Sequence, residues 1–562
     1  MYCQLKIQRQ SRTWLPVVIS LVVTLLMSCG ERTISERPVT FLRVNGHDIV
    51  NEAGEKVFLR GVGLGNWLLP EGYMWHFGEK GDRPRKIEKL ILEMTDVEYS
   101  ARFWQRFRRN FIREADIRKI RELGFNSVRP ALNARVFMTE DDSARIIMEN
   151  FQYLDSLVTW CKKYSVYIIL DMHGAPGGQT GQNIDDSPND LPELFMDKKF
   201  EERLIKLWLE IVRRYKDEPI IAGYDLLNEP LPERTGAAEK YGHLVEPLYK
   251  KLTTRIRQID SRHVIFLEGI NWSNDWSIFS ETFDDNLVYQ FHYYCWNRPD
   301  ELNSINQYIK YREKLNAPIW VGETGEKNLP VYWATTQLFE KNNIGWSFWP
   351  WKKLDRTNGL CSINRPKDWE LIANYSKGGP KPSKNEAIRV LDEFLENILF
   401  ENCRFTTEVY NSLFRQIPGR VAAVNYGHDG YMNSYFVNDT LFRSEYYRKQ
   451  EPVKIESVEN ISDWNSIQNI VLNEGEWTAY QIRSCKPDYY KCIIKINSDS
   501  EKSKITLIIN DFEKVQEITG VGWQEIQMND IKFREGKNRF KVQALTGTVR
   551  IEYFNFSKTQ EN

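Results

Sequence analysis

The chain has 562 residues, which is too long for one ordinary domain and fits two domains better. Lys and Arg total 76 and Asp and Glu total 77, so the net charge gives no electrostatic reason to expect nucleic acid as a partner. Aromatic residues make up 13% of the chain, with 18 tryptophans, which indicates either a large core or flat surfaces that stack on ring-shaped ligands.

The N-terminus has the pattern of a targeting segment. Lys6, Arg9 and Arg12 precede an apolar stretch at 15–27, which is too short to span a bilayer comfortably. The stretch ends in Ser28-Cys29 and resembles a bacterial lipoprotein signal, in which the cysteine is lipidated. We therefore expect a signal peptide at 1–29, a polar tether at 30–40 and a lipid-anchored protein of the bacterial cell envelope. The alternative is an ordinary signal peptide with a chance cysteine.

Strand-like apolar runs alternate with amphipathic stretches over most of the first 400 residues. Residues 112–123 and 203–215 place apolar side chains three to four positions apart, as helices do. Eight strands alternating with helices predict an α/β fold of the (β/α)8 TIM-barrel type. The eight runs that we interpret as buried parallel strands are 57–65, 126–133, 166–174, 221–230, 263–270, 286–294, 318–325 and 344–352.

The predicted barrel domain covers residues 41–402. Turn signals in 41–56 predict a small hairpin, an insertion at 71–110 follows the first strand, and a helix at 385–399 closes the domain. Beyond it, short alternating strands with Gly, Asn and Asp turns predict an all-β jelly-roll sandwich over 417–557.

Two glutamates end predicted strands of the barrel. Glu229 follows Asn228 at the end of the fourth strand, and Glu323 ends the seventh. Chemistry in (β/α)8 barrels takes place at this end of the strands. A retaining glycosidase needs two such carboxyl groups, one as proton donor and base and the other as nucleophile, about 5–5.5 Å apart. The pair therefore predicts that chemistry, with Glu229 as acid/base and Glu323 as nucleophile.

Other polar and aromatic side chains end the remaining strands in a consistent order. The ordered set resembles glycoside hydrolase family five, a retaining family of (β/α)8 barrels, and the resemblance covers about residues 41–400. No single piece is specific, since Asn-Glu-Pro alone is a weak motif. The set comprises Arg129, Asp171-Met172-His173, Asn228-Glu229, His292-Tyr293-Tyr294, Glu323 and Trp349.

The resemblance implies a role for each substrate-binding residue. Arg129 keeps Glu323 ionised and Tyr294 donates a hydrogen bond to it, while Asn228 bonds the sugar 2-hydroxyl. His173 and His292 orient substrate and Glu229, and Trp349 is the floor of the subsite where the bond breaks. Each of these side chains could instead be structural.

The loop after the first strand, Gly63-Leu64-Gly65-Asn66-Trp67-Leu68-Leu69-Pro70-Glu71, resembles the exo-β-1,3-glucanase branch of that family. There a glutamate of this loop bonds the terminal sugar, which implies that role for Glu71 with help from Trp67. The alternative is a loop carboxylate without a ligand. We expect a monomer that acts on a β-glucan or a related oligosaccharide or polysaccharide.

The resemblance implies no cofactor and no metal, although a metal site from Asp171, His173 and His292 is conceivable. Rival functions are a glycosidase for mannan, xyloglucan or glycolipid, or a surface glycan-binding protein that has lost catalysis.

The second domain resembles a family-six carbohydrate-binding module across 417–557. The resemblance rests on the opening run 417–426, on Gly475-Glu476-Trp477, on 520–525 and on the last strand. Ala422 and Val424 stand where that family has two acidic residues that help to hold calcium, so binding of calcium or sugar stays open. Residues that could stack on sugar, or serve only as core or surface, are Tyr426, Tyr431 and Trp464. Cys485 and Cys492 could pair across a hairpin or remain thiols.

Overall fold

The computed structural model describes residues 39–559 except 234–235, 296–304, 445–446 and 458–467. The predicted signal peptide, Cys29, nearly all of the tether and Trp464 therefore lie outside the described residues. Among the described residues, no helix combines the length and apolar character needed to cross a bilayer.

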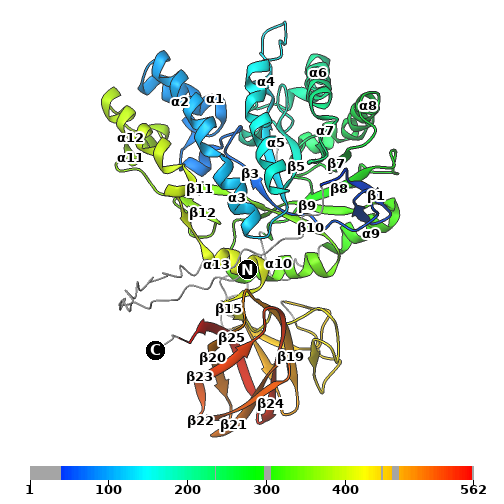
Figure 1. Cartoon of the computed structure of the whole chain (residues 1–562), viewed down its shortest axis with the longest axis vertical. Helices are drawn as coiled ribbons and strands as arrows, with labels where there is room; N and C mark the ends of the chain where they lie inside the picture. The colour runs from blue at the N-terminus through cyan, green and yellow to red at the C-terminus, as the bar shows by residue number, and fades with distance from the viewer. Residues whose placement is uncertain (1–38, 234–235, 296–304, 445–446, 458–467, 560–562) are drawn as a thin grey trace, which may run out of the picture. The chain divides into compact units, whose positions relative to one another are not determined.

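Eight parallel strands close into a barrel, as predicted, in the order β10-β3-β4-β5-β6-β7-β8-β9 (Figure 1). Nearly every strand position is buried, because the helices outside and the packed interior cover both faces of the sheet. This explains why the strands appear in the sequence as continuous apolar runs. The strands are β3 Arg60–Leu64, β4 Ser127–Asn133, β5 Tyr167–Gly174, β6 Ile221–Asp225, β7 Val264–Glu268, β8 Leu287–His292, β9 Ile319–Gly325 and β10 Gly345–Trp349.

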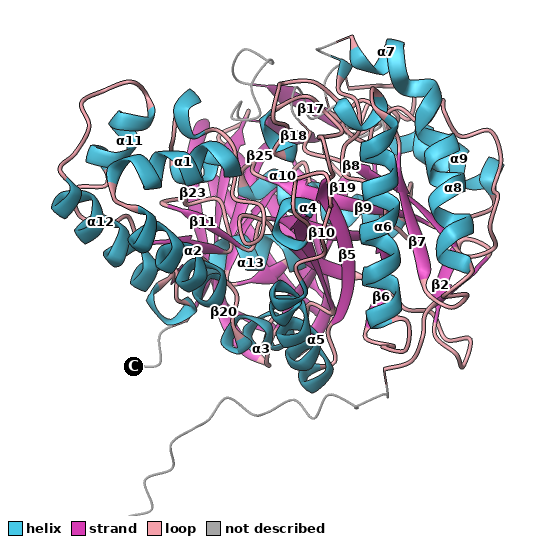
Figure 2. Cartoon of the chain, turned by 90° about the horizontal axis from the view of Figure 1, so that it is seen from above, coloured by secondary structure: helices cyan, strands magenta, loops and turns pink. Residues whose placement is uncertain are grey.

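Helices surround these strands, as the view from above in Figure 2 shows for α5, α6 and α8. In α6, Leu204, Leu207, Trp208 and Ile211 form one buried face at helical spacing, and the side chain of Asp197 caps the first turn. The helices are α3 Glu114–Glu122, α4 Ala134–Phe137, α5 Gln152–Tyr164, α6 Lys198–Tyr215, α7 Ala237–Tyr241, α8 Val245–Arg257, α9 Asn306–Leu315, α10 Leu329–Lys341 and α11 Glu370–Ser376.

The hairpin, the insertion and the closing helix form as predicted. The hairpin pairs β1 (Arg43–Asn45) with β2 (Asp48–Val50). The insertion contains the 3-10 turn η1 (Gly72–Trp75) and the helices α1 (Pro84–Met94) and α2 (Val97–Phe111), and the closing helix is α12 (Lys384–Asn397). Trp75 packs the insertion against the closing helix, with ring centroids 5.2 Å from Phe107 of α2 and 4.7 Å from Phe394 of α12.

The structure also contains a small sheet and a further helix that the sequence analysis does not predict. A small sheet joins β11 (Lys352–Leu354), β12 (Cys361–Ile363) and β13 (Arg404–Phe405). The helix α13 (Thr407–Phe414) then places Phe414 against Phe125 and Trp346, with ring centroids 5.0 and 5.9 Å apart.

The C-terminal region is a sandwich of two largely antiparallel sheets, in agreement with the predicted all-β class. Phe540 of one sheet packs on Phe554 of the other with ring centroids 4.8 Å apart. One sheet contains β14 Gln416–Ile417, β16 Tyr435–Phe436, β19 Trp477–Ser484, β21 Lys502–Ile509, β22 Phe512–Thr519 and β24 Gly536–Thr546. The other contains β15 Gly419–Ala422, β17 Lys454–Ser457, β18 Gln468–Leu472, β20 Asp488–Ser498, β23 Gly522–Phe533 and β25 Val549–Lys558.

Of the tyrosines proposed for sugar stacking, Tyr426 is fully buried and carries the Arg448 guanidinium 3.6 Å from its ring centroid. That face of the ring is therefore occupied, whereas Tyr431 is exposed. Cys485 and Cys492 are free thiols, and Cys485 contacts Gln416 instead.

Candidate active site

The carboxyl ends of the barrel strands open into a cavity of about 1010 Å³. Its walls come from strand ends and from the loops that follow them, as expected for a barrel of this type. The lining includes Glu71 after β3, His173 of β5, Glu229 after β6, Trp272 after β7, His292 of β8, Glu323 of β9 and Trp349 of β10.

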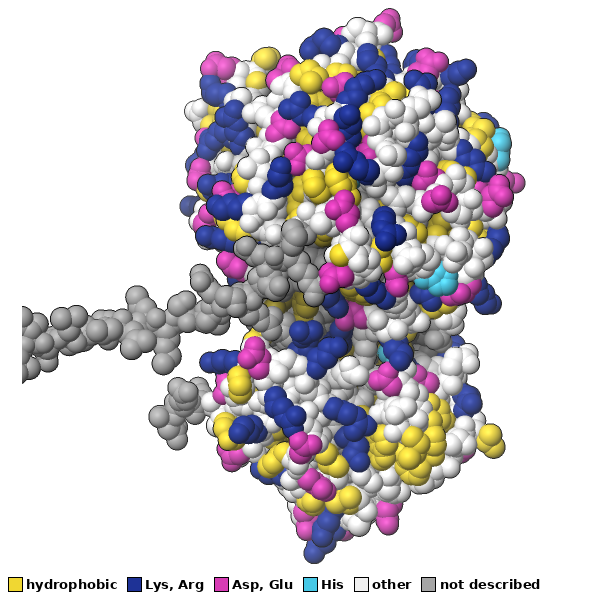
Figure 3. Space-filling view, turned by 45° about the vertical axis from the view of Figure 1, so that its right-hand side comes forward, with side chains coloured by type: hydrophobic (Ala, Val, Ile, Leu, Met, Phe, Trp, Pro, Cys, Tyr) yellow, Lys and Arg dark blue, Asp and Glu magenta, His cyan; other side chains and the backbone are white. Residues whose placement is uncertain are grey.

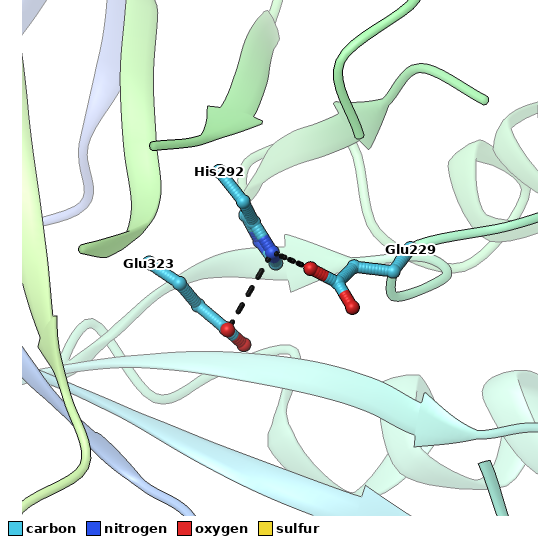
Figure 4. A group of neighbouring side chains, drawn as sticks. All are labelled: Glu229, His292 and Glu323. Carbon is cyan, nitrogen blue, oxygen red and sulfur yellow. Dashed lines mark hydrogen bonds and ion pairs between the residues drawn. The ribbon is translucent and has the colours of Figure 1, made fainter. Parts of the chain in front are cut away.

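Glu229 and Glu323 face each other across His292 (Figure 4). The Nδ1 atom of His292 lies 2.6 Å from Glu229 Oε1 and 3.5 Å from Glu323 Oε2. One oxygen of each carboxylate and a ring nitrogen lie within 4.8 Å of one another. The two glutamates thus come from different strands to one point of the cavity, close enough for both to contact a single small reacting group.

Arg129 lies beneath this pair and is completely buried. It donates hydrogen bonds to Glu323 Oε1 at 2.7 Å, Asp225 Oδ2 at 2.8 Å, and both Asn228 Oδ1 and Glu268 Oε1 at 2.9 Å. The planar guanidinium suits such a ring of acceptors because its five N–H groups point outward in fixed directions. Arg129 therefore links the ends of β6, β7 and β9.

Burial shifts the protonation of the carboxyl groups around Arg129. It raises the pKa of Asp171 to about 8 and that of Asp225 to about 7, although the positive charge of Arg129 opposes both shifts. Burial also raises the pKa of Glu323, while His292 and Arg129 act in the opposite direction. Removing charge from several of these groups reduces the mutual repulsion of carboxylates that share one cation.

His173 is held on one face of its ring and at both nitrogens. Its Nδ1 lies 2.8 Å from Asp171 Oδ2, Asn228 Nδ2 lies 3.4 Å from its Nε2, and the Trp349 ring stacks on it with centroids 5.2 Å apart. Burial lowers the pKa of His173 to about 4, so the ring is neutral at pH 7. In the tautomer that satisfies both contacts, Nδ1 carries the hydrogen.

Glycines of β3 and its loop make room for Trp349. A Cβ atom on Gly63 would lie 2.2 Å from the Trp349 ring, and one on Gly65 would lie 2.5 Å from it. The Trp349 indole N–H points to the hydroxyl of Tyr73 at 3.4 Å. Trp351, two positions on, is turned away from the cavity and stacks on Phe400, so Trp349 is the tryptophan of this strand that lines the cavity.

Of the remaining predicted residues, Tyr294 and Glu71 line the cavity, whereas Asn228 is completely buried and is not among the residues that line it. Tyr294 donates a hydrogen bond to Glu323 Oε2 at 2.7 Å. Glu71 is buried in the cavity wall, and burial together with the charge of Glu323 raises its pKa well above the usual range. Trp67 is buried in the core, where its indole N–H bonds to the Arg108 carbonyl, and it does not line the cavity.

The sequence analysis does not name several residues of the site, among them Tyr73, Glu326 and Lys353 of the cavity wall and two residues of β7 or the loop after it. Glu268 ends that strand and contacts Arg129. Trp272 lines the cavity within the run 271–273, in which three consecutive non-glycine residues have positive φ. The available signal was that the fifth apolar run also ends in a glutamate, Leu267-Glu268-Gly269.

Among the described residues, the side chains whose ligand atoms could surround a metal ion are Glu229, His292 and Glu323. The set differs from the Asp171, His173 and His292 combination that the sequence made conceivable. It consists of the two strand-end glutamates and the histidine between them.

The barrel is similar to known glycoside hydrolases. Residues 92–355 match the model of the Cellulase family (glycosyl hydrolase family 5). A β-xylosidase of Phanerodontia chrysosporium is 29% identical over 363 residues, which cover 58% of this chain and 74% of that protein. Endoglucanase C of Acetivibrio thermocellus is 26% identical over 306 residues, covering 44% and 85% respectively. A sporulation-specific glucan 1,3-β-glucosidase of Saccharomyces cerevisiae is 25% identical over 324 residues, covering 52% and 69%.

The family match lies over the barrel strands β4–β10, which carry Arg129, Glu229 and Glu323 to the cavity. The match to this family model and the relatives named as β-xylosidase, endoglucanase and glucan β-glucosidase show that the protein is a glycoside hydrolase.

Proposed function

We propose that the protein is a retaining β-glycosidase that hydrolyses a β-glucan, with Glu229 as acid/base and Glu323 as nucleophile. The observation that carries this proposal is the approach of the two carboxylates to within 4.8 Å in one cavity. Retaining enzymes hold the two carboxyl groups about 5–5.5 Å apart, whereas inverting enzymes leave about 6.5–9.5 Å for a water molecule.

The reaction would proceed in two displacements. Glu323 attacks the anomeric carbon, the glycosidic C–O bond breaks, and Glu229 gives its proton to the leaving oxygen. Glu229, now ionised, takes a proton from water, whose oxygen attacks the same carbon and releases Glu323. The atoms of the added water are accounted for: its oxygen and one hydrogen end up in the hydroxyl group of the released sugar, and its other proton restores Glu229, which gave its own proton to the leaving group.

The contacts of Glu323 suit the role of nucleophile. Arg129 at 2.7 Å and the Tyr294 hydroxyl at 2.7 Å each bond one carboxylate oxygen, and both interactions favour the ionised form that attack requires. We propose that Asn228, held by Arg129, bonds the sugar 2-hydroxyl and that Trp349, which lines the cavity, lies under the ring in the subsite of cleavage.

Glu323→Ala should lower turnover of an aryl β-glucoside by several orders of magnitude, because no covalent intermediate can form. Azide should partly restore turnover by attacking in its place. Glu326→Gln is the matched control, since Glu326 lines the same cavity but pairs with Lys353, and its loss should be far smaller. Near wild-type turnover in Glu323→Ala would exclude the assignment.

The β-glucan substrate is proposed from the relatives named as endoglucanase and glucan 1,3-β-glucosidase, and from the likeness of the Glu71 loop to exo-acting enzymes. We expect Glu71 to bond the sugar at the closed end of the cavity. Product analysis on glucans of defined linkage tests this, and faster release of sugar from mannan or xyloglucan than from any β-glucan would contradict it.

We further propose that the protein is anchored in the bacterial cell envelope by lipid on Cys29 and that the C-terminal sandwich binds carbohydrate. Cys29→Ala should release the protein from membranes into the soluble fraction. Wild-type protein that is already soluble after fractionation of cells would contradict the anchor.

A further inference from the structure

Glu268 occupies the end of β7 between the two catalytic glutamates and is completely buried. Its Oε1 accepts hydrogen bonds from Arg129 Nη2 and from Gln290 Nε2, each at 2.9 Å. Its Oε2 accepts the backbone N–H of Glu229 at 2.6 Å. A buried carboxylate with three donors is costly to desolvate unless each contact is kept, so this group has little freedom to move.

The contact with Glu229 falls where the backbone is strained. Glu229 has φ of 41°, in the left-handed region that non-glycine residues rarely adopt, and Leu231 two positions on has φ of 52°. A strained residue of this kind persists only when its surroundings hold it there. The short hydrogen bond that the Glu229 N–H donates to Glu268 is one such restraint, and it acts on the residue proposed to give a proton to the leaving oxygen.

Glu268 also reaches the side chain of Glu229 through His292. Nε2 of His292 lies 3.4 Å from Glu268 Oε1, while Nδ1 of the same ring lies 2.6 Å from Glu229 Oε1. Although burial favours the neutral ring, the negative charges of Glu268, Glu323 and Glu229 raise the pKa of His292 well above its usual range. Burial likewise opposes ionisation of Glu268, but His292, Arg129 and the Glu229 N–H lower its pKa.

We propose that Glu268 is a positioning residue for the proton donor: it fixes the main chain of Glu229 directly and its carboxyl group through His292. This inference rests on the proposed double-displacement mechanism and adds a residue to it. Glu268 does not touch the reacting atoms. Its loss should therefore weaken proton donation and spare attack by Glu323.

The alternative is that Glu268 serves only as a counter-ion for Arg129. Asp225 offers the matched comparison, because it is also fully buried and also accepts a hydrogen bond from Arg129, at 2.8 Å. Unlike Glu268, Asp225 has no hydrogen bond or ion pair to Glu229 or His292 among the contacts of the described residues. If Glu268 were only a counter-ion, replacing it should affect catalysis in the same way as replacing Asp225.

The test compares kcat/KM for two substrates, since this ratio reports the first displacement alone. A glucan oligosaccharide has a sugar leaving group that needs a proton, whereas 2,4-dinitrophenyl β-glucoside has a leaving group that needs none. Glu268→Gln keeps the shape of the side chain but turns one acceptor into a donor. We expect it to lower kcat/KM for the oligosaccharide by about 100-fold, as for a misplaced catalytic group. For the activated glucoside we expect kcat/KM to fall by less than about 10-fold. Asp225→Asn should lower both values by the same factor.

An equal fall for both substrates in Glu268→Gln would overturn the proposal. If that variant does not fold, Glu268→Asp keeps the charge and withdraws the carboxylate by one methylene, and the same selective loss is expected of it. Failure of the proposed function gives a different result, because wild-type protein would then hydrolyse neither substrate, or Glu323→Ala would hydrolyse both at the wild-type rate.

Discussion

At the scale of single residues, the site depends on one buried cation that serves several carboxyl groups. Arg129 bonds or faces the side chains of Asp171, Asp225, Glu268 and Glu323 with no exposed surface of its own. Desolvating such a cluster is expensive. The hydrogen bonds of Arg129 to Asp225, Glu268 and Glu323 offset part of that cost, although Asp171 Oδ1 and Asp225 Oδ1 have no hydrogen bond among the described residues. We interpret the cluster as the means by which the barrel holds one carboxylate ready for attack.

Replacing Arg129 by Met should lower the free energy of unfolding by about 3–5 kcal/mol, because it leaves buried carboxylates without their cation. Denaturant unfolding measures the change. The control is Arg262→Met, since Arg262 pairs with Asp217 on the surface with both side chains largely exposed, and a change of about 0–1 kcal/mol is typical there. Equal losses in the two variants would show that burial does not set the cost.

At the scale of elements, β3 and β10 are matched to each other. Gly63 pairs with Arg129 of β4 in the sheet, and its missing side chain leaves the space that the Trp349 ring occupies. The sequence shows only a Gly-Leu-Gly run and a tryptophan some 280 positions apart, and the physical reason for the glycines appears when β3 and β10 pair to close the barrel.

Gly63→Ala should displace Trp349 from its place against His173, because the new Cβ would lie 2.2 Å from the ring. Overpacking of this kind costs about 1–3 kcal/mol of stability. We also expect a rise in KM, since the displaced ring is the proposed floor for the sugar. Gly359→Ala is the control, as nothing lies within 4 Å of its Cβ position. Unchanged KM and stability in Gly63→Ala would refute this account.

The helix α13 is a second case in which packing decides the behaviour of an element. A chain that ends after Arg415 retains α13 and the contacts of Phe414 with Phe125 and Trp346, whereas one that ends after Asn402 loses them. Deletion of a buried phenylalanine side chain costs about 3–5 kcal/mol. We therefore expect the longer truncation product to unfold at the higher denaturant concentration. The reverse order would mean that α13 adds nothing to the barrel.

At the scale of the whole molecule, the surface is electrically balanced. On the face in Figure 3, Lys and Arg side chains are interspersed with Asp and Glu side chains, in line with the net charge of −1. Charge effects on this protein are thus concentrated in buried groups, whose protonation differs between the folded and unfolded states.

His428 gives a pH dependence with a defined sign. Burial and the charge of Arg448 lower its pKa to about 4 in the folded protein, whereas the unfolded value is about 6.5. As pH falls from 7 to 5, the unfolded chain takes up a proton that folded His428 refuses, so the folded state loses stability. The loss should be about 2 kcal/mol smaller in His428→Gln.

Denaturant unfolding at the two pH values measures this difference. His243→Gln is the control, because His243 is exposed and water solvates its ring in both states; it should lose as much stability as wild type. A loss in His428→Gln equal to that of wild type would contradict the assignment.

The sequence by itself determined the eight barrel strands, the flanking hairpin, the closing helix and the all-β C-terminal region. These features depend on local patterns, namely apolar runs, helical spacing and turn residues, which are visible in short stretches of the sequence. It also pointed to Glu229 and Glu323, because both end apolar runs and the resemblance to glycoside hydrolase family five rests in part on these two positions.

The tertiary structure alone decided which strand ends meet. Arg129 and Glu323 are 194 positions apart in the chain and 2.7 Å apart in the barrel, and the backbone of Glu229 meets Glu268 from the neighbouring strand. Such contacts depend on the closure and register of the sheet, which no local pattern encodes. Local patterns likewise do not show that Trp67 faces the core or that Arg448 covers Tyr426. The contact of Glu268 with Arg129 also depends on the assembled strands.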